Sequence, residues 1–241
     1  VTDENGDGRI DLSDVEYLMR NKKNTMTLLE GDGDFRSPEC VELLKEADIV
    51  VTNPPFSLFR DYVALLMQYN KQFAIIGNQN AITYREIFPL IKSNKIWLGY
   101  NNGHYWFMVP DSYEEKKTDF KIDESGQKWR RMGNICWFTN LDIEKRHEDM
   151  TLFRTYSPDI YPKYDNYDAI EVSKTADIPC DYDGYMGVPI TFMQYYNPEQ
   201  FEIAGLDDHR VEWVGHGPRL NGKVKYRRVI IRRKQVNTNE N

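Results

Sequence analysis

The stretch "EADIVVTNPPFSLFRDYV", residues 46–63, places a short apolar run directly before two prolines and a helical pattern. The run Ile49–Thr52 predicts a buried strand. The helical spacing of Leu58, Tyr62, Leu65 and Leu66 predicts a helix after it. Proline fixes the backbone and donates no hydrogen bond, so the prolines end the strand at a rigid corner. The sequence therefore predicts a strand, a corner and a helix in succession.

The neighbouring segments repeat this alternation. A helix over residues 38–46, with Ser37 as its N-cap, precedes the corner, and the apolar run "QFAIIGN" at 72–78 predicts a buried parallel strand. "YREIFPLIKSN" at 84–94 then predicts a helix, and "IWLGY" a further strand. Strands that alternate with helices indicate an α/β fold with a parallel sheet.

The pattern changes after residue 103. "HYWFMVP" and "GNICWFTNL" predict a pair of strands, separated by a charged loop over residues 111–132. Beyond residue 154 the chain is rich in Tyr, Asp and Pro and has few helical periods, which predicts a more irregular α+β lobe. We predict three parts, namely residues 1–24, 25–148 and 149–241.

Composition limits the class of protein. The chain has 241 residues and a net charge of −7, and no apolar run reaches the roughly 18 residues of a membrane span. Cys40, Cys136 and Cys180 form no zinc or disulfide pattern. These features favour a cytoplasmic globular protein with no membrane partner.

The corner offers groups that suit an exocyclic amine. The Oδ1 atom of Asn53 and the carbonyl of Pro54 are two acceptors that can receive the two N–H groups of such an amine, and Phe56 offers a face for a planar base. This chemistry needs no covalent intermediate. The alternative is an ordinary strand-ending turn, in which Asn and Pro are common.

Together with its neighbours, the corner resembles the EcoRI-type adenine-specific DNA methyltransferase family. The resemblance rests on "GDGDFRSPECVELLKEADIVVTNPPFSLFRDYV", "FAIIGNQNAITYREIFPLIK", "GNICWFTNLD", "YPKYDNYDAIEV" and "DYDGYMGVPITFMQYYNPEQFEIAGL". It implies a Rossmann-like S-adenosylmethionine-dependent sheet with helices on both faces. It also implies that Asn53, Pro54, Pro55 and Phe56 hold an adenine flipped out of double-stranded DNA.

The same resemblance implies that Asp34 and Phe35 contact the adenine of S-adenosylmethionine. The alternative for this pair is a plain loop-to-helix junction. No strand followed by a glycine-rich turn precedes them, because neither "NGDGR" nor "EGDGD" follows an apolar run. We therefore expect that the first strands of the sheet are missing and that the isolated chain binds the cofactor poorly.

Two charged segments predict further sites. "DENGDGRIDLSD" at 3–14 has the spacing of an EF-hand calcium loop, and its alternative is an acidic surface turn. Its candidate ligands are Asp3, Asn5, Asp7, Arg9 and Asp14. The basic segment "KVKYRRVIIRRK" predicts a DNA-contacting strand, and its alternative is a solvated edge strand. Its candidate residues are Lys223, Lys225, Arg227, Arg228, Arg232 and Arg233.

The function that these features favour is transfer of a methyl group to adenine N6 in DNA, as in restriction–modification systems. Two alternatives stay open. The same corner could serve an RNA adenine or a protein glutamine amide, or the chain could be a non-catalytic remnant that binds DNA or calcium.

Overall fold

The computed structural model describes residues 6–8, 12–21, 28–206 and 217–234. Its contacts group into two units, residues 1–47 and 48–241, and each is described by itself. The first unit contains α1 (Leu12–Arg20) and α2 (Pro38–Glu46). The predicted cap of α2 is confirmed, because the Ser37 hydroxyl accepts a hydrogen bond from the Cys40 N–H group at 3.2 Å. The divisions predicted at residues 24 and 148 stay predictions.

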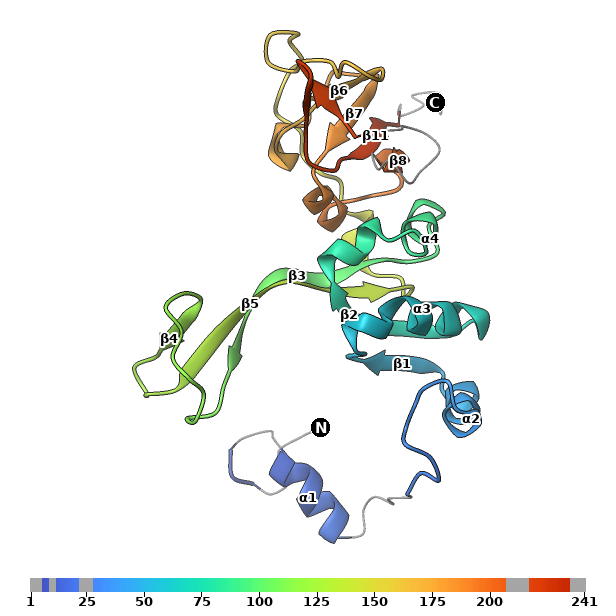
Figure 1. Ribbon diagram of the computed structural model, residues 1–241, viewed down its shortest axis with the longest axis vertical. Coiled ribbons are helices and arrows are strands. Elements are labelled where there is room, and N and C mark those ends of the chain that lie inside the picture. The colour runs from blue at the N-terminus through green and yellow to red at the C-terminus, as the bar shows by residue number, and fades with distance from the viewer. Residues whose placement is uncertain (1–5, 9–11, 22–27, 207–216, 235–241) are drawn as a thin grey trace, which may run out of the picture. The chain divides into compact units, whose positions relative to one another are not determined.

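The first sheet of the second unit has the strand order β1-β2-β5-β3, with β4 paired to β5 (Figure 1). Its strands are β1 (Ile49–Thr52), β2 (Gln72–Asn78), β3 (Trp97–Met108), β4 (Phe120–Ile122) and β5 (Lys128–Thr139). β1 and β2 are parallel, with Thr52 opposite Ile75, which confirms the predicted parallel pair. β5 runs antiparallel to both β2 and β3. The fold is therefore mixed α/β.

β1 has the predicted bounds but not the predicted burial. Val51 is 66% exposed, and Ile49 is exposed as well. The prediction of a buried strand is wrong because β1 lies at the edge of its sheet, where β2 is its one partner among the described strands.

The helix α3 (Phe59–Gln68) packs on one face of this sheet through its buried side chains Phe59, Val63 and Leu66. The Phe59 and Phe138 rings lie 4.9 Å apart. A Cβ atom at Gly77 would come within 2.9 Å of both rings, so the close approach of helix and sheet requires glycine there. The 3₁₀ helix Gln79–Thr83 and α4 (Phe88–Lys92) follow β2.

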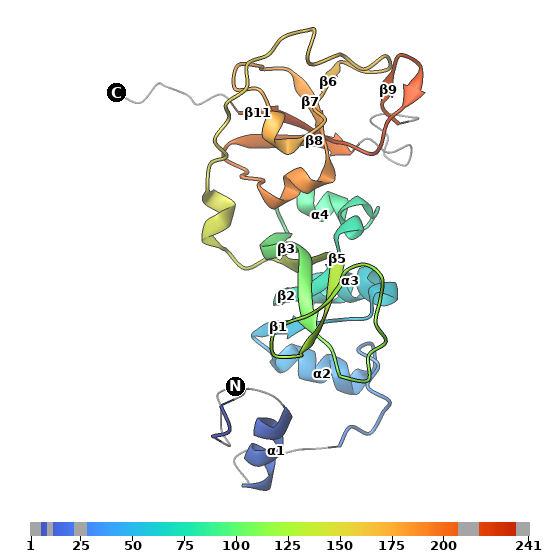
Figure 2. The ribbon, with the colours of Figure 1, turned by 90° about the vertical axis from the view of Figure 1, so that its left-hand side faces the viewer.

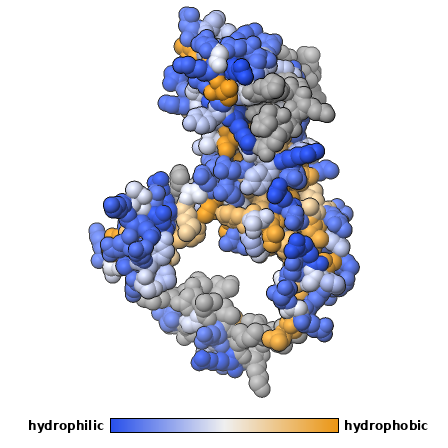
Figure 3. All heavy atoms as spheres, viewed as in Figure 1, coloured by the Kyte–Doolittle hydropathy of each residue, from blue (hydrophilic) through white to orange (hydrophobic). Residues whose placement is uncertain are grey.

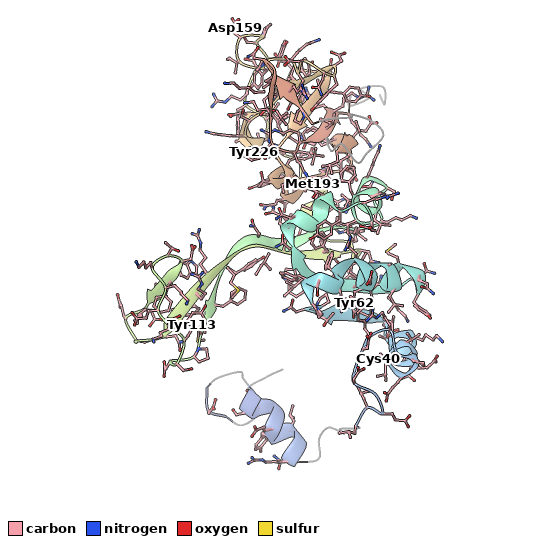
Figure 4. All side chains as sticks on the ribbon, viewed as in Figure 1. Cys40, Tyr62, Tyr113, Asp159, Met193 and Tyr226 are labelled. Atoms are coloured by element: carbon pink, nitrogen blue, oxygen red, sulfur yellow. The ribbon has the colours of Figure 1, made fainter. Side chains whose placement is uncertain are left out.

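β3 and β5 continue well past the end of β2. β2 pairs with β5 as far as Asn78 opposite Ile135, whereas the β3–β5 pairing continues to Met108 opposite Trp129. We call residues 105–134 the arm, which projects from the sheet in Figure 1 and carries Tyr113 in Figure 4. The predicted loop over 111–132 is wrong in part, because this segment contains β4 and the first residues of β5.

One carboxylate organises the turn of the arm. Asp123 accepts hydrogen bonds from the Ser125 hydroxyl at 2.6 Å, from the indole N–H of Trp129 at 2.7 Å and from two backbone N–H groups. These bonds, led by that of Ser125, lower the pKa of Asp123 to about 2.

Asp123 is expected to stabilise the arm in a pH-dependent way. Because its pKa is lower in the folded chain, this stabilisation is complete above its ordinary pKa of 3.8 and is lost as the pH falls toward 2. The Trp129 indole proton resonance should shift over that range, and Asp123→Asn should abolish the shift. If the midpoint of this shift lay near pH 4, it would contradict the lowered pKa of Asp123.

A second sheet follows with the order β6-β7-β11-β8 (Figure 2). Its strands are β6 (Ala169–Glu171), β7 (Tyr185–Val188), β8 (Phe201–Leu206) and β11 (Val229–Arg233), and a separate ribbon joins β9 (Arg219–Leu220) to β10 (Lys223–Val224). The core of the second sheet includes Ile170, Phe192 and Ile230, all fully buried. Within the described ranges, no helix has the length and apolarity needed to cross a bilayer.

Candidate functional site: an amide corner at the sheet edge

The Asn-Pro-Pro-Phe corner follows β1 directly. Pro54 is buried, which anchors the corner. A 3₁₀ turn (Phe56–Leu58) then leads into α3, and the Leu58 N–H group donates to the Pro55 carbonyl at 2.9 Å. The corner is thus held by its backbone and by the buried Pro54.

The chemically useful groups of the corner face solvent. Asn53 is exposed, and the Phe56 ring is 41% exposed. In the described part of the chain, neither the Asn53 amide nor the Pro54 carbonyl is hydrogen-bonded. Buried polar groups in proteins are nearly always paired, but exposed acceptors such as these are available to a ligand. The corner therefore offers two acceptors and an aromatic face.

A further polar group lies where the neighbouring strand ends. Because β1 and β2 are parallel, their carboxyl ends lie at one edge of the sheet, the usual ligand site of open α/β sheets. Gln79 follows β2 and is 6% exposed, yet its Nε2 atom has no partner among the described residues. The sequence prediction missed Gln79, although its position after an apolar strand was visible.

Asp34 and Phe35 lie in the first unit. The guanidinium group of Arg36 donates to both carboxylate oxygens of Asp34, at 3.0 and 2.7 Å, and lies 5.3 Å from the centroid of the Phe35 ring. The hydrogen bonds from Arg36 lower the pKa of Asp34 to about 2. The carboxylate is therefore charged at neutral pH and keeps lone pairs to accept a further hydrogen bond.

The basic residues near the C-terminal end of the described chain fall into two groups. Lys223, Lys225 and Arg227 are exposed, whereas Arg228 is buried and donates twice to Glu171. The remaining two are also engaged, because Arg232 pairs with Glu202 at 2.7 Å and Arg233 donates to the Cys180 carbonyl. The basic segment was predicted as one strand, but it forms two, because residues 225–228 connect β10 to β11.

A groove lies between the 3₁₀ helix after β2 and the link to β11. It has a volume of 720 Å³, and its lining includes Thr83, Tyr84, Tyr226 and Arg227. The Arg227 guanidinium donates a hydrogen bond to the Thr83 hydroxyl at 2.7 Å, although the two residues are 144 positions apart in the sequence. Tyr226, which also lines the groove, is labelled in Figure 4. The groove therefore combines an exposed aromatic ring with a cation.

The predicted calcium loop is only partly described. Asp3, Asn5 and Arg9 lie outside the described residues, Asp7 is exposed, and Asp14 is buried within α1. Within the described ranges, no cluster of three or more His, Cys, Asp or Glu side chains could hold a metal ion. Calcium binding therefore gains no support and stays a prediction.

Comparison with known proteins gives three curated relatives and one family. The chain is 51% identical to the type II methyltransferase M.EcoRI of Escherichia coli, over 86% of this chain and 64% of that protein. It is 42% identical to the type II methyltransferase M.MgeORF184P of Mycoplasma genitalium, over 92% of this chain and 75% of that protein. It is 41% identical to the type II methyltransferase M.MpnI of Mycoplasma pneumoniae, over 86% of this chain and 70% of that protein. No solved structure matches it.

The chain thus spans less than two thirds of the length of its E. coli relative. The model of the family described as adenine-specific methyltransferase EcoRI matches residues 1–234, so the acidic segment at 3–14 lies inside the match. This chain belongs to the EcoRI family of adenine-specific methyltransferases.

Proposed function

We propose that this chain carries the catalytic corner of a site-specific DNA methyltransferase that acts on adenine N6. One observation carries the proposal: the unpaired acceptors of Asn53 and Pro54 and the exposed Phe56 ring lie together at the carboxyl edge of a sheet in a chain of this family. The three relatives are each named as type II methyltransferases, which supports the reaction class.

The corner would act by holding the amine. The lone pair of an adenine N6 amine is delocalised into the ring, so the amine is a weak nucleophile. Hydrogen bonds from its two N–H groups to Asn53 Oδ1 and the Pro54 carbonyl favour a pyramidal nitrogen, on which the lone pair is available for attack. Phe56 would stack on the base, which must leave the duplex at a cost of a few kcal/mol.

Asp34 and Phe35 are the residues that we propose for the cofactor. S-adenosylmethionine supplies the methyl group as a sulfonium, and its adenine carries an amino group and a planar face. The charged Asp34 carboxylate can accept from that amino group, and the partly exposed Phe35 ring can pack against the purine. The residues present therefore fit one end of the cofactor.

For DNA, we propose contacts from Lys223, Lys225 and Arg227, because their side chains are exposed; Arg227 would make its contact while one of its N–H groups donates to Thr83. Arg228 is instead assigned a structural role, since its guanidinium is buried against Glu171. In this proposal the β1-β2-β5-β3 sheet is part of a Rossmann-like sheet, and residues 149–241 form the lobe that recognises the target.

Methyl transfer tests the proposal directly. The protein, expressed from its full reading frame, is expected to label duplex DNA with methyl groups from S-adenosylmethionine, and mass spectrometry of the digested DNA should identify N6-methyladenine. RNA and a glutamine-containing peptide serve as competing substrates. Transfer to either of these with none to DNA would contradict the proposal.

A further inference from the structure

The arm leaves the sheet at the edge that carries the corner. β5 runs antiparallel to β2, and Ile135 lies opposite Asn78, the last residue of β2. The residues of β5 that precede Ile135 therefore lie beyond the carboxyl end of β2, on the side where Asn53 follows β1. From Ile135 to Trp129 the strand extends about 20 Å, at about 3.3 Å per residue.

One face of the arm combines tryptophan rings with a lysine. Lys121 on β4 places its Nζ atom 4.7 Å from the centroid of the Trp106 ring and 5.8 Å from that of Trp129. On the same face, Trp106 is 38% exposed and Met108 is 65% exposed. Exposed aromatic groups of this kind commonly mark an interaction surface. We call Trp106, Met108, Lys121 and Trp129 the aromatic face.

Lys121 is the cation of this face, and the Asp123 carboxylate beside it is already bonded to the Trp129 indole. Arg131 is paired with Asp119 at 2.9 Å, and Arg130 donates to the Thr118 and Asp119 carbonyls. Lys121 has no carboxylate partner among the described residues, so its ammonium group is available to an anion. Figure 3 shows a largely hydrophilic surface over the outer part of the arm and hydrophobic residues where it joins the sheet.

We propose that the aromatic face of the arm contacts duplex DNA beside the base held at Asn53, an inference that rests on the proposed function. A base held at the corner brings its duplex to the carboxyl edge, where the arm begins. A β-ribbon fits the major groove of DNA, and a lysine beside an aromatic ring can pair with phosphate while the ring packs on sugar or base.

DNA affinity as a function of salt tests the role of Lys121. With a fluorescent duplex, Lys121→Gln is expected to reduce the slope of log K against log salt by about 0.9, the value of one phosphate contact. Lys117→Gln removes the same charge from an exposed loop of the same arm and should leave the slope unchanged. Equal slopes for the two variants would overturn the proposal.

The tryptophan is tested separately. Trp106→Ala is expected to weaken DNA binding about tenfold, as for loss of a stacked aromatic group. The matched control is Ile122→Ala, because Ile122 is also exposed on β4 but lies on the opposite face from Lys121. An equal effect of the two substitutions would overturn the role of the aromatic face.

The two proposals fail in different ways. If the unaltered protein methylates DNA but the arm variants bind it normally, the arm proposal fails alone. If the unaltered protein neither binds nor methylates DNA, the proposed function fails and the arm proposal with it. If Trp106→Ala converts a dimer into a monomer in sedimentation experiments without DNA, the face binds a second copy and the proposal is overturned.

Discussion

Asn53→Ala is expected to lower the rate of methyl transfer by about 10²- to 10³-fold, or about 2.7–4 kcal/mol, the usual effect of removing one group that stabilises a transition state. The Asn53 amide is exposed and is not hydrogen-bonded within the described chain, so its loss is expected to remove the proposed acceptor for the substrate amine and no structural contact. Single-turnover transfer to duplex DNA at saturating substrate measures this effect.

A matched control separates the role of Asn53 from a disturbance of the corner. Ser57 is another exposed polar residue of the same turn, and Ser57→Ala should leave the rate unchanged. The free energy of unfolding should change by less than about 0.5 kcal/mol in both variants, as for surface substitutions elsewhere. Full activity of Asn53→Ala would refute the role of its amide.

Arg228→Met is expected to cost about 3–5 kcal/mol of unfolding free energy, because it leaves a buried carboxylate without its partner. Glu171 accepts from Arg228 Nε at 3.1 Å and Nη2 at 2.6 Å, and it also accepts from the hydroxyls of Tyr164 and Ser173. Both members of the pair are buried. Urea denaturation monitored by circular dichroism measures the loss.

An exposed pair on the same sheet provides the control. Arg232 and Glu202 are both about two-fifths exposed, so Arg232→Met should cost at most about 1 kcal/mol. The double variant Arg228→Met with Glu171→Leu should recover much of the loss, because no unpaired charge is left buried. Equal losses for Arg228→Met and Arg232→Met would contradict the assigned burial of the first pair.

The same pair makes stability depend on pH. Burial by itself raises the pKa of Glu171, but hydrogen bonds from Arg228 and Tyr164 outweigh it and hold the pKa below its ordinary value of 4.5. The stabilisation is therefore complete above pH 4.5 and is lost as the pH falls through the lowered pKa. The difference in unfolding free energy between the unaltered protein and the double variant should shrink in that acidic range.

Local signals account for the elements that the sequence predicted correctly. The β1 strand and the capped α2 helix depend on neighbouring residues, namely the apolar run before Pro54 and the hydroxyl of Ser37. Burial depends on partners that are distant in sequence. The α3 helix was predicted, and of its predicted apolar residues Leu66 is buried, whereas the other two buried residues, Phe59 and Val63, each follow a predicted one by a single position.

The functional and structural residues of the candidate sites show the same difference between local signals and long-range contacts. The corner at residues 53–56 was visible because its four residues are contiguous and follow an apolar run. The Glu171–Arg228 pair joins residues 57 positions apart, so no local pattern distinguishes Arg228 from the exposed Arg227 beside it. The length of the arm was also missed, because charged residues occupy the segment that contains β4.

The open side of β1 affects how the isolated chain behaves at high concentration. Its outer row of N–H and C=O groups has no strand partner among the described residues, and Ile49 and Val51 add apolar surface beside that row. Such an edge is a template on which another polypeptide can form hydrogen bonds as an added strand. The strand that precedes Asn53 is therefore also the part of this sheet that we expect to be most prone to self-association.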